Sequence, residues 1–182
     1  MWHGSGVVES RVILVGADDR EVGTEEKMRA HREGLRHRAF SVFVFNRAGR
    51  LLLQQRAADK YHSGGLWSNT CCSHPRPGES VLEAAHRRVR EEMGFDCALH
   101  TRFAFIYKAV LAGGVIEHEY DHVLSGRFDG DPLPDSREVD AWRWEAVAVI
   151  RQDIVARPEA YAIWFRFALE RAEEFGILNS EF

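Results

Sequence analysis

Two short segments of the chain bring together side chains that can move protons. The first holds Cys72 and His74, and the second holds Glu117 and Glu119 on either side of His118. Residues two apart on a strand point to the same face, so the two carboxylates share a face and His118 points away. A thiol and a metal-bound carboxylate suit a reaction that adds a proton to one face of a substrate and removes one from the other. The pattern therefore favours a two-base proton transfer, as in an isomerase.

The cysteines could be either structural or reactive. Cys71 and Cys72 are adjacent, which is typical of small buried residues, and Cys97 is expected in the core. Three cysteines do not make a disulfide framework. In a reducing compartment at least one thiol of the adjacent pair can therefore remain reactive.

The composition predicts a single domain over residues 1–182, with its core at about 24–170. A hydrophobic content of 45% and only five prolines argue against disorder. The formal charge of -4, with both signs interspersed, makes nucleic acid and anionic membranes unexpected partners. No apolar stretch is long enough to span a bilayer and no signal peptide is evident, so we expect a cytoplasmic protein. Met1–Gly6 is expected to be flexible.

The patterning around these segments predicts alternating strands and helices. Strands are expected at 11–16, 39–46, 50–56, 103–110, 115–126 and 140–144, and helices at about 24–30, 79–93, 145–152 and 159–175. The two central strand pairs are expected to be hairpins, joined at Arg47–Gly49 and Ala112–Gly114. The order of elements predicts an α/β (α+β) fold in which a mixed sheet lies between helices.

The helix expected at 79–93 carries a charged motif. Arg88 and Glu92 lie four residues apart on one face, which alone is most typical of a solvated ion pair. Counted back from Gly94, the spacing resembles the Nudix signature at Glu79, Arg87, Glu91 and Glu92. Ser73 replaces its leading glycine, and Arg88 replaces the glutamate after the arginine. Nudix hydrolases hold divalent cations on a diphosphate with these acids, so Arg88 removes one ligand and supplies a phosphate partner.

That departure, the Cys-x-His pair and the Glu-x-Glu strand together resemble type I isopentenyl diphosphate isomerase, a family with the Nudix fold. The resemblance extends from about Lys27 to Trp164. It implies a Nudix-like mixed sheet between helices. It also implies interconversion of isopentenyl and dimethylallyl diphosphate in isoprenoid biosynthesis, with proton transfer on opposite faces through a tertiary carbocation.

The same resemblance implies a site for one divalent cation. Its ligands would be His31, His37, His74, Glu117 and Glu119. Such a set suits Mn²⁺ or Mg²⁺ and can accept Zn²⁺. A second, substrate-linked Mg²⁺ would contact Glu92 and the backbone carbonyl of Cys72. The histidines that match no position of the family are expected to be structural or exposed: His62, His86, His100 and His122.

The resemblance also implies how the work is divided among the remaining residues. Glu119, helped by the Tyr107 hydroxyl, would protonate the substrate, and Cys72 as a thiolate would remove a proton. Trp164 would offer its ring to the carbocation, a desolvated contact worth about 2 kcal/mol or more. Cys71 is an additional cysteine that could compete for the role of Cys72. The diphosphate is expected on the basic residues Lys27, Arg56, Lys60 and Arg88.

Two other functions also fit the sequence. A Nudix hydrolase of a nucleoside diphosphate derivative would use metal-activated water and should not depend on Cys72, although Arg88 argues against it. A non-catalytic diphosphate-binding or metal-sensing module would keep the basic residues and could dispense with Cys72 and Glu119. For the isomerase, water must be kept from the carbocation, so the N-terminal segment or the C-terminal helix is expected to close over the site.

Overall fold

The strands of this computed structural model form one mixed sheet centred on β3. The structure describes residues 10–60 and 62–179, so Met1–Gly6 lies outside them. The strands are β1 (Arg11–Val15), β2 (Glu21–Glu26), β3 (His37–Phe45), β4 (Leu51–Arg56), β5 (Trp67–Ser68), β6 (Cys71–Ser73), β7 (Leu99–Val110), β8 (Ile116–Arg127) and β9 (Val139–Glu145). One edge of β3 pairs in parallel with β8 along its whole length, and the other pairs with β1, β6 and β4 in succession. The neighbours of β3 therefore bring distant parts of the chain to one place.

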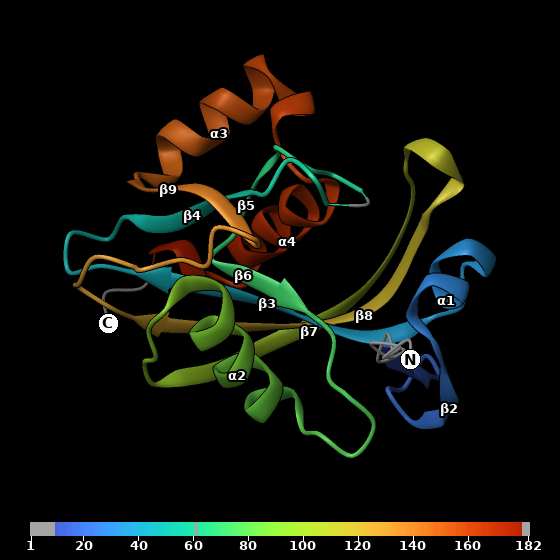
Figure 1. Cartoon of the computed structure of the whole chain (residues 1–182). Coiled ribbons are helices and arrows are strands. Elements are labelled where there is room, and N and C mark those ends of the chain that lie inside the picture. The colour runs from blue at the N-terminus through green and yellow to red at the C-terminus, as the bar shows by residue number, and fades with distance from the viewer. Residues whose placement is uncertain (1–9, 61, 180–182) are drawn as a thin grey trace, which may run out of the picture.

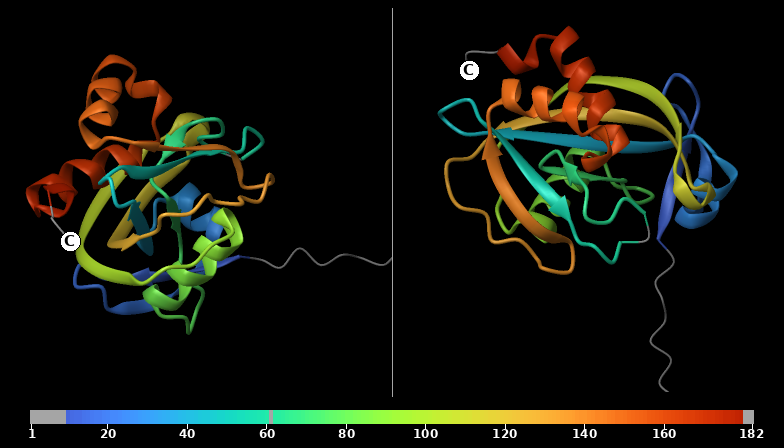
Figure 2. Two further views of the ribbon diagram at one scale, coloured as in Figure 1. Left: turned by 90° about the vertical axis from the view of Figure 1, so that its left-hand side faces the viewer. Right: turned by 90° about the horizontal axis from the view of Figure 1, so that it is seen from above.

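Helices cover the sheet on both faces, as expected. They are α1 (Lys27–Glu33), α2 (Val81–Met93), α3 (Val147–Ala156) and α4 (Ile163–Glu174). Figures 1 and 2 show α2 on one side of the curved sheet and α3 with α4 on the other, while α1 lies near the hairpin end of β7 and β8. None of the described helices is long and apolar enough to cross a membrane.

The alternation of β3 explains the two layers of core. Val42 and Val44 are fully buried against the cluster of α2, which includes Ala85 and Val89. Phe43 lies in the other cluster, with Phe165 of α4. Because successive side chains of a strand point to opposite faces, one apolar strand supplies both cores.

Local sequence explains where α2 begins and ends. Ser80 and Glu83 form a reciprocal capping box at its first turn, and Gly94 adopts a left-handed conformation after its last turn. The side chain that caps α1 is Glu26, which accepts hydrogen bonds from Met28 N and Arg29 N. The prediction that this helix begins at residue 24 was therefore wrong, because residues 21–26 pair with β1 instead.

The other boundaries were predicted with mixed success. The hairpin of β7 and β8 is confirmed, with a 3₁₀ turn at Ala112–Gly114. β4 follows β3 antiparallel but pairs mainly with β9. The helix expected over 159–175 is divided, because Pro158–Ala160 forms a separate 3₁₀ turn and Tyr161 bridges to Trp67 before α4 begins.

Candidate active site

A cavity of about 280 Å³ opens at the end of the sheet where β3, β6, β8 and α4 meet. The predicted residues that line it are Lys27, Arg56, Lys60, Cys72, His74, Arg88, Glu92, Tyr107, Glu117, Glu119 and Trp164. His31 and His37 are fully buried beside it. The structure therefore brings together every residue predicted for the site, from eight helices and strands and two loops.

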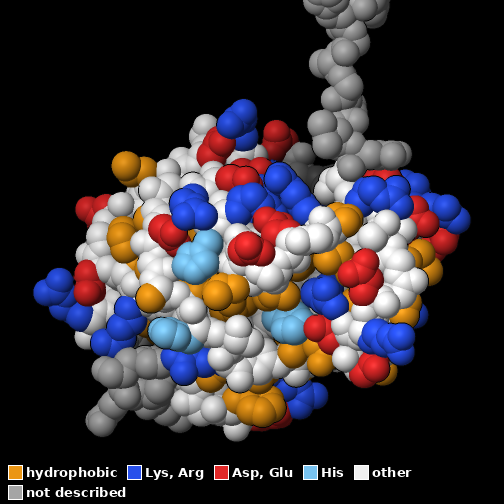
Figure 3. All heavy atoms as spheres, turned by 90° about the horizontal axis from the view of Figure 1, so that it is seen from below, with side chains coloured by type: hydrophobic (Ala, Val, Ile, Leu, Met, Phe, Trp, Pro, Cys, Tyr) orange, Lys and Arg blue, Asp and Glu red, His pale blue; other side chains and the backbone are white. Residues whose placement is uncertain are grey.

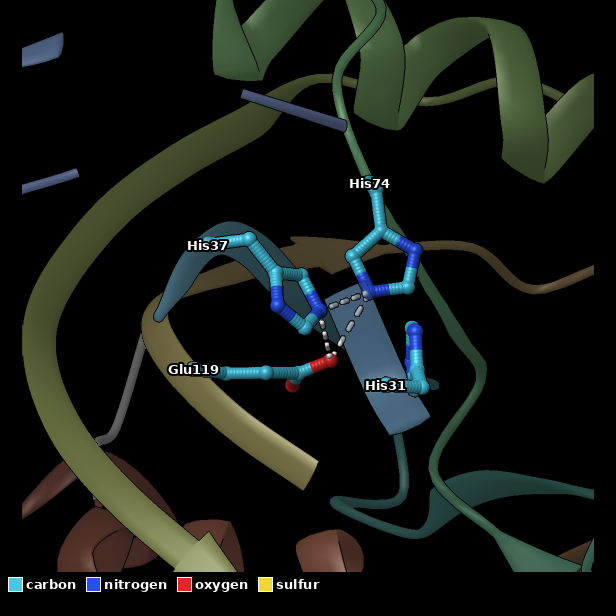
Figure 4. A group of neighbouring side chains, drawn as sticks. All are labelled: His31, His37, His74 and Glu119. Atoms are coloured by element: carbon cyan, nitrogen blue, oxygen red, sulfur yellow. Dashed lines mark hydrogen bonds and ion pairs between the residues drawn. The ribbon is translucent and has the colours of Figure 1, made fainter. Parts of the chain in front are cut away.

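Register explains why the central residues meet. Glu119 lies between His37 on β3 and Tyr107 on β7, each its direct partner across a strand pair. Tyr107 Oη donates a 2.6 Å hydrogen bond to Glu119 Oε2. His74 follows β6 and places its Nε2 2.8 Å from Glu119 Oε1. Figure 4 shows the rings of His37 and His74 turned toward this carboxylate, with His31 beside them.

Backbone contacts fix the tautomers of two of these rings. Nδ1 of His31 lies 2.7 Å from Lys27 O, and Nδ1 of His37 lies 2.8 Å from Leu35 O. A carbonyl oxygen only accepts, so each Nδ1 carries a hydrogen, and each ring with no second hydrogen presents a lone pair at Nε2. This arrangement of a ring nitrogen held by a carbonyl is the usual support for a metal-binding histidine.

The Nε2 atoms of His37 and His74 and the Glu119 carboxylate have more hydrogen-bond acceptors among them than hydrogens to share. Nε2 of His74 is 3.2 Å from Nε2 of His37 as well as 2.8 Å from Glu119, and it carries one hydrogen at most. Donor atoms of His31, His37, His74 and Glu119 all lie within 4.8 Å of one another. Three imidazoles and one carboxylate around one point fit a divalent cation such as Mn²⁺, Mg²⁺ or Zn²⁺.

The pKa values of Glu117 and Glu119 are shifted in opposite directions by their surroundings. Burial and the neighbouring charge of Glu119 raise the pKa of Glu117. Burial would also raise the pKa of Glu119, but its interactions with the His37 and His74 imidazoles outweigh burial and hold that pKa well below the usual value. Burial raises the pKa of Tyr107 well above its usual value, so its hydroxyl remains a donor.

Strand alternation separates the two adjacent cysteines. Cys72 is opposite Ser41 and lines the cavity, whereas Cys71 is opposite Val42 and is fully buried in the core against α2. Cys71 is therefore placed away from a substrate in this cavity. Burial raises the pKa of Cys72 to about 12, with Arg56 opposing the shift, so the ion-free protein holds Cys72 as a thiol.

Basic side chains from four parts of the chain face the same cavity. Lys60 Nζ lies 2.6 Å from Glu138 Oε2, and Arg88 Nη2 lies 3.3 Å from the same oxygen. Arg88 also donates two hydrogen bonds to Glu92 Oε1. The Nε of Arg56 is buried and makes no hydrogen bond within the described residues. Glu138, which was not predicted from the sequence, therefore positions Lys60 and Arg88, two of the residues expected to bind the diphosphate.

Trp164 reaches the cavity from the first turn of α4. Its Nε1 donates a 2.9 Å hydrogen bond to Ser68 Oγ, which fixes the plane of the ring. The guanidinium carbon of Arg56 lies 5.1 Å from the ring centre, within the range of a cation–π contact. The ring is therefore held where a cation in the cavity can meet it.

His62 is a further site residue that the sequence analysis missed, since it was expected to be structural or exposed. Its side chain is 10% exposed, its Nε2 lies 3.4 Å from Glu117 Oε1, and it lines the cavity. Burial, together with the charges of Arg56 and Lys27, lowers the pKa of His62 to about 3, so the ring is neutral. Nothing in the local sequence marks this loop histidine. The other three histidines do not line the cavity, and His86 pairs instead with Asp96.

Comparison with known proteins assigns the family. A family model described as NUDIX domain matches residues 35–165. "Isopentenyl-diphosphate Delta-isomerase 1" of Aromatoleum aromaticum is 55% identical over 164 residues, which cover 90% of this chain and 93% of that protein. "Isopentenyl-diphosphate Delta-isomerase" of Burkholderia multivorans is 56% identical over 91% of this chain and 94% of the relative. The chain belongs to the isopentenyl-diphosphate Delta-isomerase family of NUDIX proteins.

Solved structures of lower identity share the fold of this isomerase family member. DR0079 from Deinococcus radiodurans superposes with a TM-score of 0.75 at 20% identity, over 89% of this chain and 98% of that one. The MutT protein of Methanosarcina mazei gives a TM-score of 0.64, also at 20% identity, over 80% of this chain and 96% of that one. The predicted Nudix-like fold is therefore confirmed.

The Nudix helix of this isomerase family member is organised by ion pairs. Arg87 donates two hydrogen bonds to Glu79, and Arg88 takes the place of an acid and contacts Glu91 and Glu92. Figure 3 shows the molecule from the side of α2, where basic and acidic side chains are interspersed. That face offers no broad basic surface of the kind that nucleic acid requires.

Proposed function

We propose that this chain interconverts isopentenyl diphosphate and dimethylallyl diphosphate, with Glu119 and Cys72 as its two proton-transfer groups. One observation carries the proposal: a carboxylate held by histidines and a thiol line the same cavity, beside a cluster of basic side chains. β8, which carries Glu119, and β6, which carries Cys72, lie on opposite edges of β3. The two groups can thus approach a substrate from different sides.

The cation would be held by His31, His37, His74, Glu117 and Glu119, and Mn²⁺, Mg²⁺ and Zn²⁺ all suit these donors. When bound, it would supply positive charge that polarises the Glu119 carboxyl group. Glu92 and the carbonyl of Cys72 would contact a Mg²⁺ that enters with the diphosphate. Lys27, Arg56, Lys60 and Arg88 would bind the diphosphate oxygens through charge-assisted hydrogen bonds.

In the proposed reaction Glu119 gives one proton to the substrate and Cys72 takes one from it. Glu119, with Tyr107 donating to its other oxygen, gives a proton to the terminal alkene carbon, and positive charge develops on the neighbouring tertiary carbon. The Trp164 ring faces that charge, and the Cys72 thiolate removes a proton from the adjacent methylene. Each turnover leaves a Glu119 carboxylate and a Cys72 thiol, from which the reverse reaction starts. The low pKa of Glu119 and the high pKa of Cys72 match this second state.

The test is proton exchange in deuterated buffer. The protein, loaded with Mg²⁺, is incubated with isopentenyl diphosphate, and carbon-bound protons are followed by NMR. We expect dimethylallyl diphosphate that carries deuterium, and loss of this product in Cys72→Ala and in Glu119→Gln. Cys97→Ala is the matched control, because this cysteine does not line the cavity. Release of phosphate without label at carbon would overturn the isomerase and favour a hydrolase.

Ligand binding separates the isomerase from a non-catalytic module. Both should bind inorganic diphosphate with Mg²⁺, but only the isomerase loses turnover in the two variants while it keeps binding.

We propose a small isoprenoid diphosphate as the partner, with no role for nucleic acid or membrane. We also propose a cytoplasmic location and a single domain over residues 1–182, with α4 as the described element that helps exclude water.

A further inference from the structure

The loop between β4 and β5 carries His62 into the cation cluster. Its ends are joined by hydrogen bonds from Gly65 N to Arg56 O (2.9 Å) and from Arg56 N to Leu66 O (3.0 Å). Gln55 Nε2 also donates to Gly65 O at 2.9 Å. The loop is therefore tied to the end of β4 on both sides of His62.

The backbone after His62 is held in an unusual conformation. Ser63 has a φ of 52°, which L residues other than Asn and Asp rarely adopt. A side chain at Gly64 would collide with the carbonyl of Ala58. Strained and tightly packed backbone is typical of positions that place a functional side chain, so this loop fixes where the His62 ring lies.

The ring lies beside both a predicted ligand and the predicted carbocation partner. Nε2 of His62 is 3.4 Å from Glu117 Oε1, while Nε2 of His31 is 3.4 Å from the other oxygen, Oε2. The edge of the His62 ring meets the Trp164 ring at 90° with centroids 5.7 Å apart. His62 and His31 therefore lie near different oxygens of the same Glu117 carboxylate.

Donor spacing distinguishes a shared ion from a simple hydrogen bond. Nitrogen–oxygen hydrogen bonds are mostly about 2.7–3.2 Å long, so 3.4 Å is long for a direct bond between His62 and Glu117. Two ligands of one ion, each at about 2.1 Å and at right angles, lie about 3 Å apart. The donor atoms of His31, His62 and Glu117 all lie within 4.8 Å of one another.

We propose that His62 is an additional ligand of the divalent cation, so that its donors come from His31, His37, His62, His74, Glu117 and Glu119. His31 belongs to both groups of neighbouring donor atoms, and its Nε2 lies 3.4 Å from Glu117 Oε2, which joins the two groups. A further imidazole shifts the preference of the site away from Mg²⁺, which favours oxygen ligands, toward Mn²⁺, Co²⁺ or Zn²⁺. The inference rests on the proposed ligand set but not on isomerisation.

Cobalt substitution tests this assignment without any measurement of turnover. Co²⁺ is added to the metal-free protein, to His62→Ala and to a control, His100→Ala, because His100 is exposed and does not line the cavity. We expect His62→Ala to weaken Co²⁺ binding by at least about tenfold and to intensify its visible absorption, because a lower coordination number strengthens these bands. His100→Ala should match the wild type. An unchanged spectrum with unchanged affinity would overturn the proposal.

NMR of the Co²⁺-loaded wild type answers the same question if His62→Ala does not fold. Imidazole N–H protons of ligands are displaced far outside the normal range by the paramagnetic ion. We expect such signals from His31, His37, His62 and His74. If the signal of His62 is not displaced, or if His62→Ala weakens binding without losing a displaced signal, His62 acts only through Glu117 and the proposal fails. Failure of deuterium transfer with these signals present would count against the isomerase alone.

Discussion

The thiol of Cys72 lies in an environment that disfavours its ionisation. Burial raises its pKa to about 12, and the carboxylates of Glu92 and Glu119 act in the same direction, while Arg56 opposes them. Divalent cations that bind with a diphosphate would add positive charge to this cavity and so favour the thiolate. If Cys72 is the proposed proton-transfer group, remaining a thiol without substrate would protect it from oxidation and alkylation between turnovers.

Alkylation of the metal-free protein measures this directly. In the presence of a chelator, the rate of reaction of Cys72 with iodoacetamide should rise about tenfold per pH unit between pH 7 and 10, because the thiolate fraction is still growing below a pKa of about 12. Mass spectrometry of the Cys72 peptide gives the rate. A plateau below pH 9 would show that the thiol ionises readily without substrate.

Tyr107 supports Glu119 through one short hydrogen bond. Tyr107→Phe removes the donor at 2.6 Å but keeps the ring packed against Phe105 and Phe167. We expect kcat to fall about tenfold to a hundredfold, since a hydrogen bond to a charged group is worth about 1.5–3 kcal/mol. Thermal stability should change little. Tyr120→Phe, whose ring packs beside His122, is the control; equal kcat in both variants would remove Tyr107 from the mechanism.

At the scale of elements, the end of α2 is fixed by a glycine that also contacts another loop. Gly94 has a φ of 72°, and a side chain there would collide with the carbonyl of Leu133, whose N–H in turn donates to Met93 O. The loop after β8 is thereby held against the Nudix helix. This contact keeps Glu138, further along the same loop, next to Lys60 and Arg88.

Substitutions at Gly49 and Gly94 separate the cost of backbone strain from the cost of the collision with Leu133. Gly49 has nearly the same φ of 69°, but nothing lies within 4 Å of an added side chain. Gly49→Ala should cost about 1 kcal/mol from backbone strain alone. Gly94→Ala should lower the free energy of unfolding by at least about 1 kcal/mol more, because the collision adds to the strain. Urea denaturation of both variants measures the difference, and equal losses would mean that the contact is relieved at no cost.

Elements whose signals were local could be predicted from the sequence. The helix ending at Gly94 and the hairpin around Gly113 depend on nearby turn and cap residues. Thr24 was misassigned because a β1 partner, and not its own neighbours, decides its conformation. The family motif placed His31, Glu119 and the basic residues, but His62 enters the cluster through the tertiary path of its loop, for which the sequence carries no periodic signal.

At the scale of the whole molecule, cation binding should stabilise the fold. His31, His37 and His74 belong to separate elements, and an ion that binds only the folded arrangement raises stability by mass action. Saturating Mn²⁺ should raise Tm by several degrees relative to protein with a chelator. His37→Ala should abolish this increase, whereas His100→Ala should retain it. Calorimetry measures both, and an equal increase in His37→Ala would place the ion elsewhere.

The parallel pairing of β3 with β8 has a consequence for how the chain folds. His37 and Glu119 are direct partners in that register, although a large part of the chain separates them. A slip of one residue would turn every carboxylate of β8 to the opposite face. The cation site therefore cannot exist in an early intermediate built from local contacts, because long-range pairing is slow to form. The rate at which refolding protein binds the ion would therefore measure how fast β3 and β8 pair in the correct register.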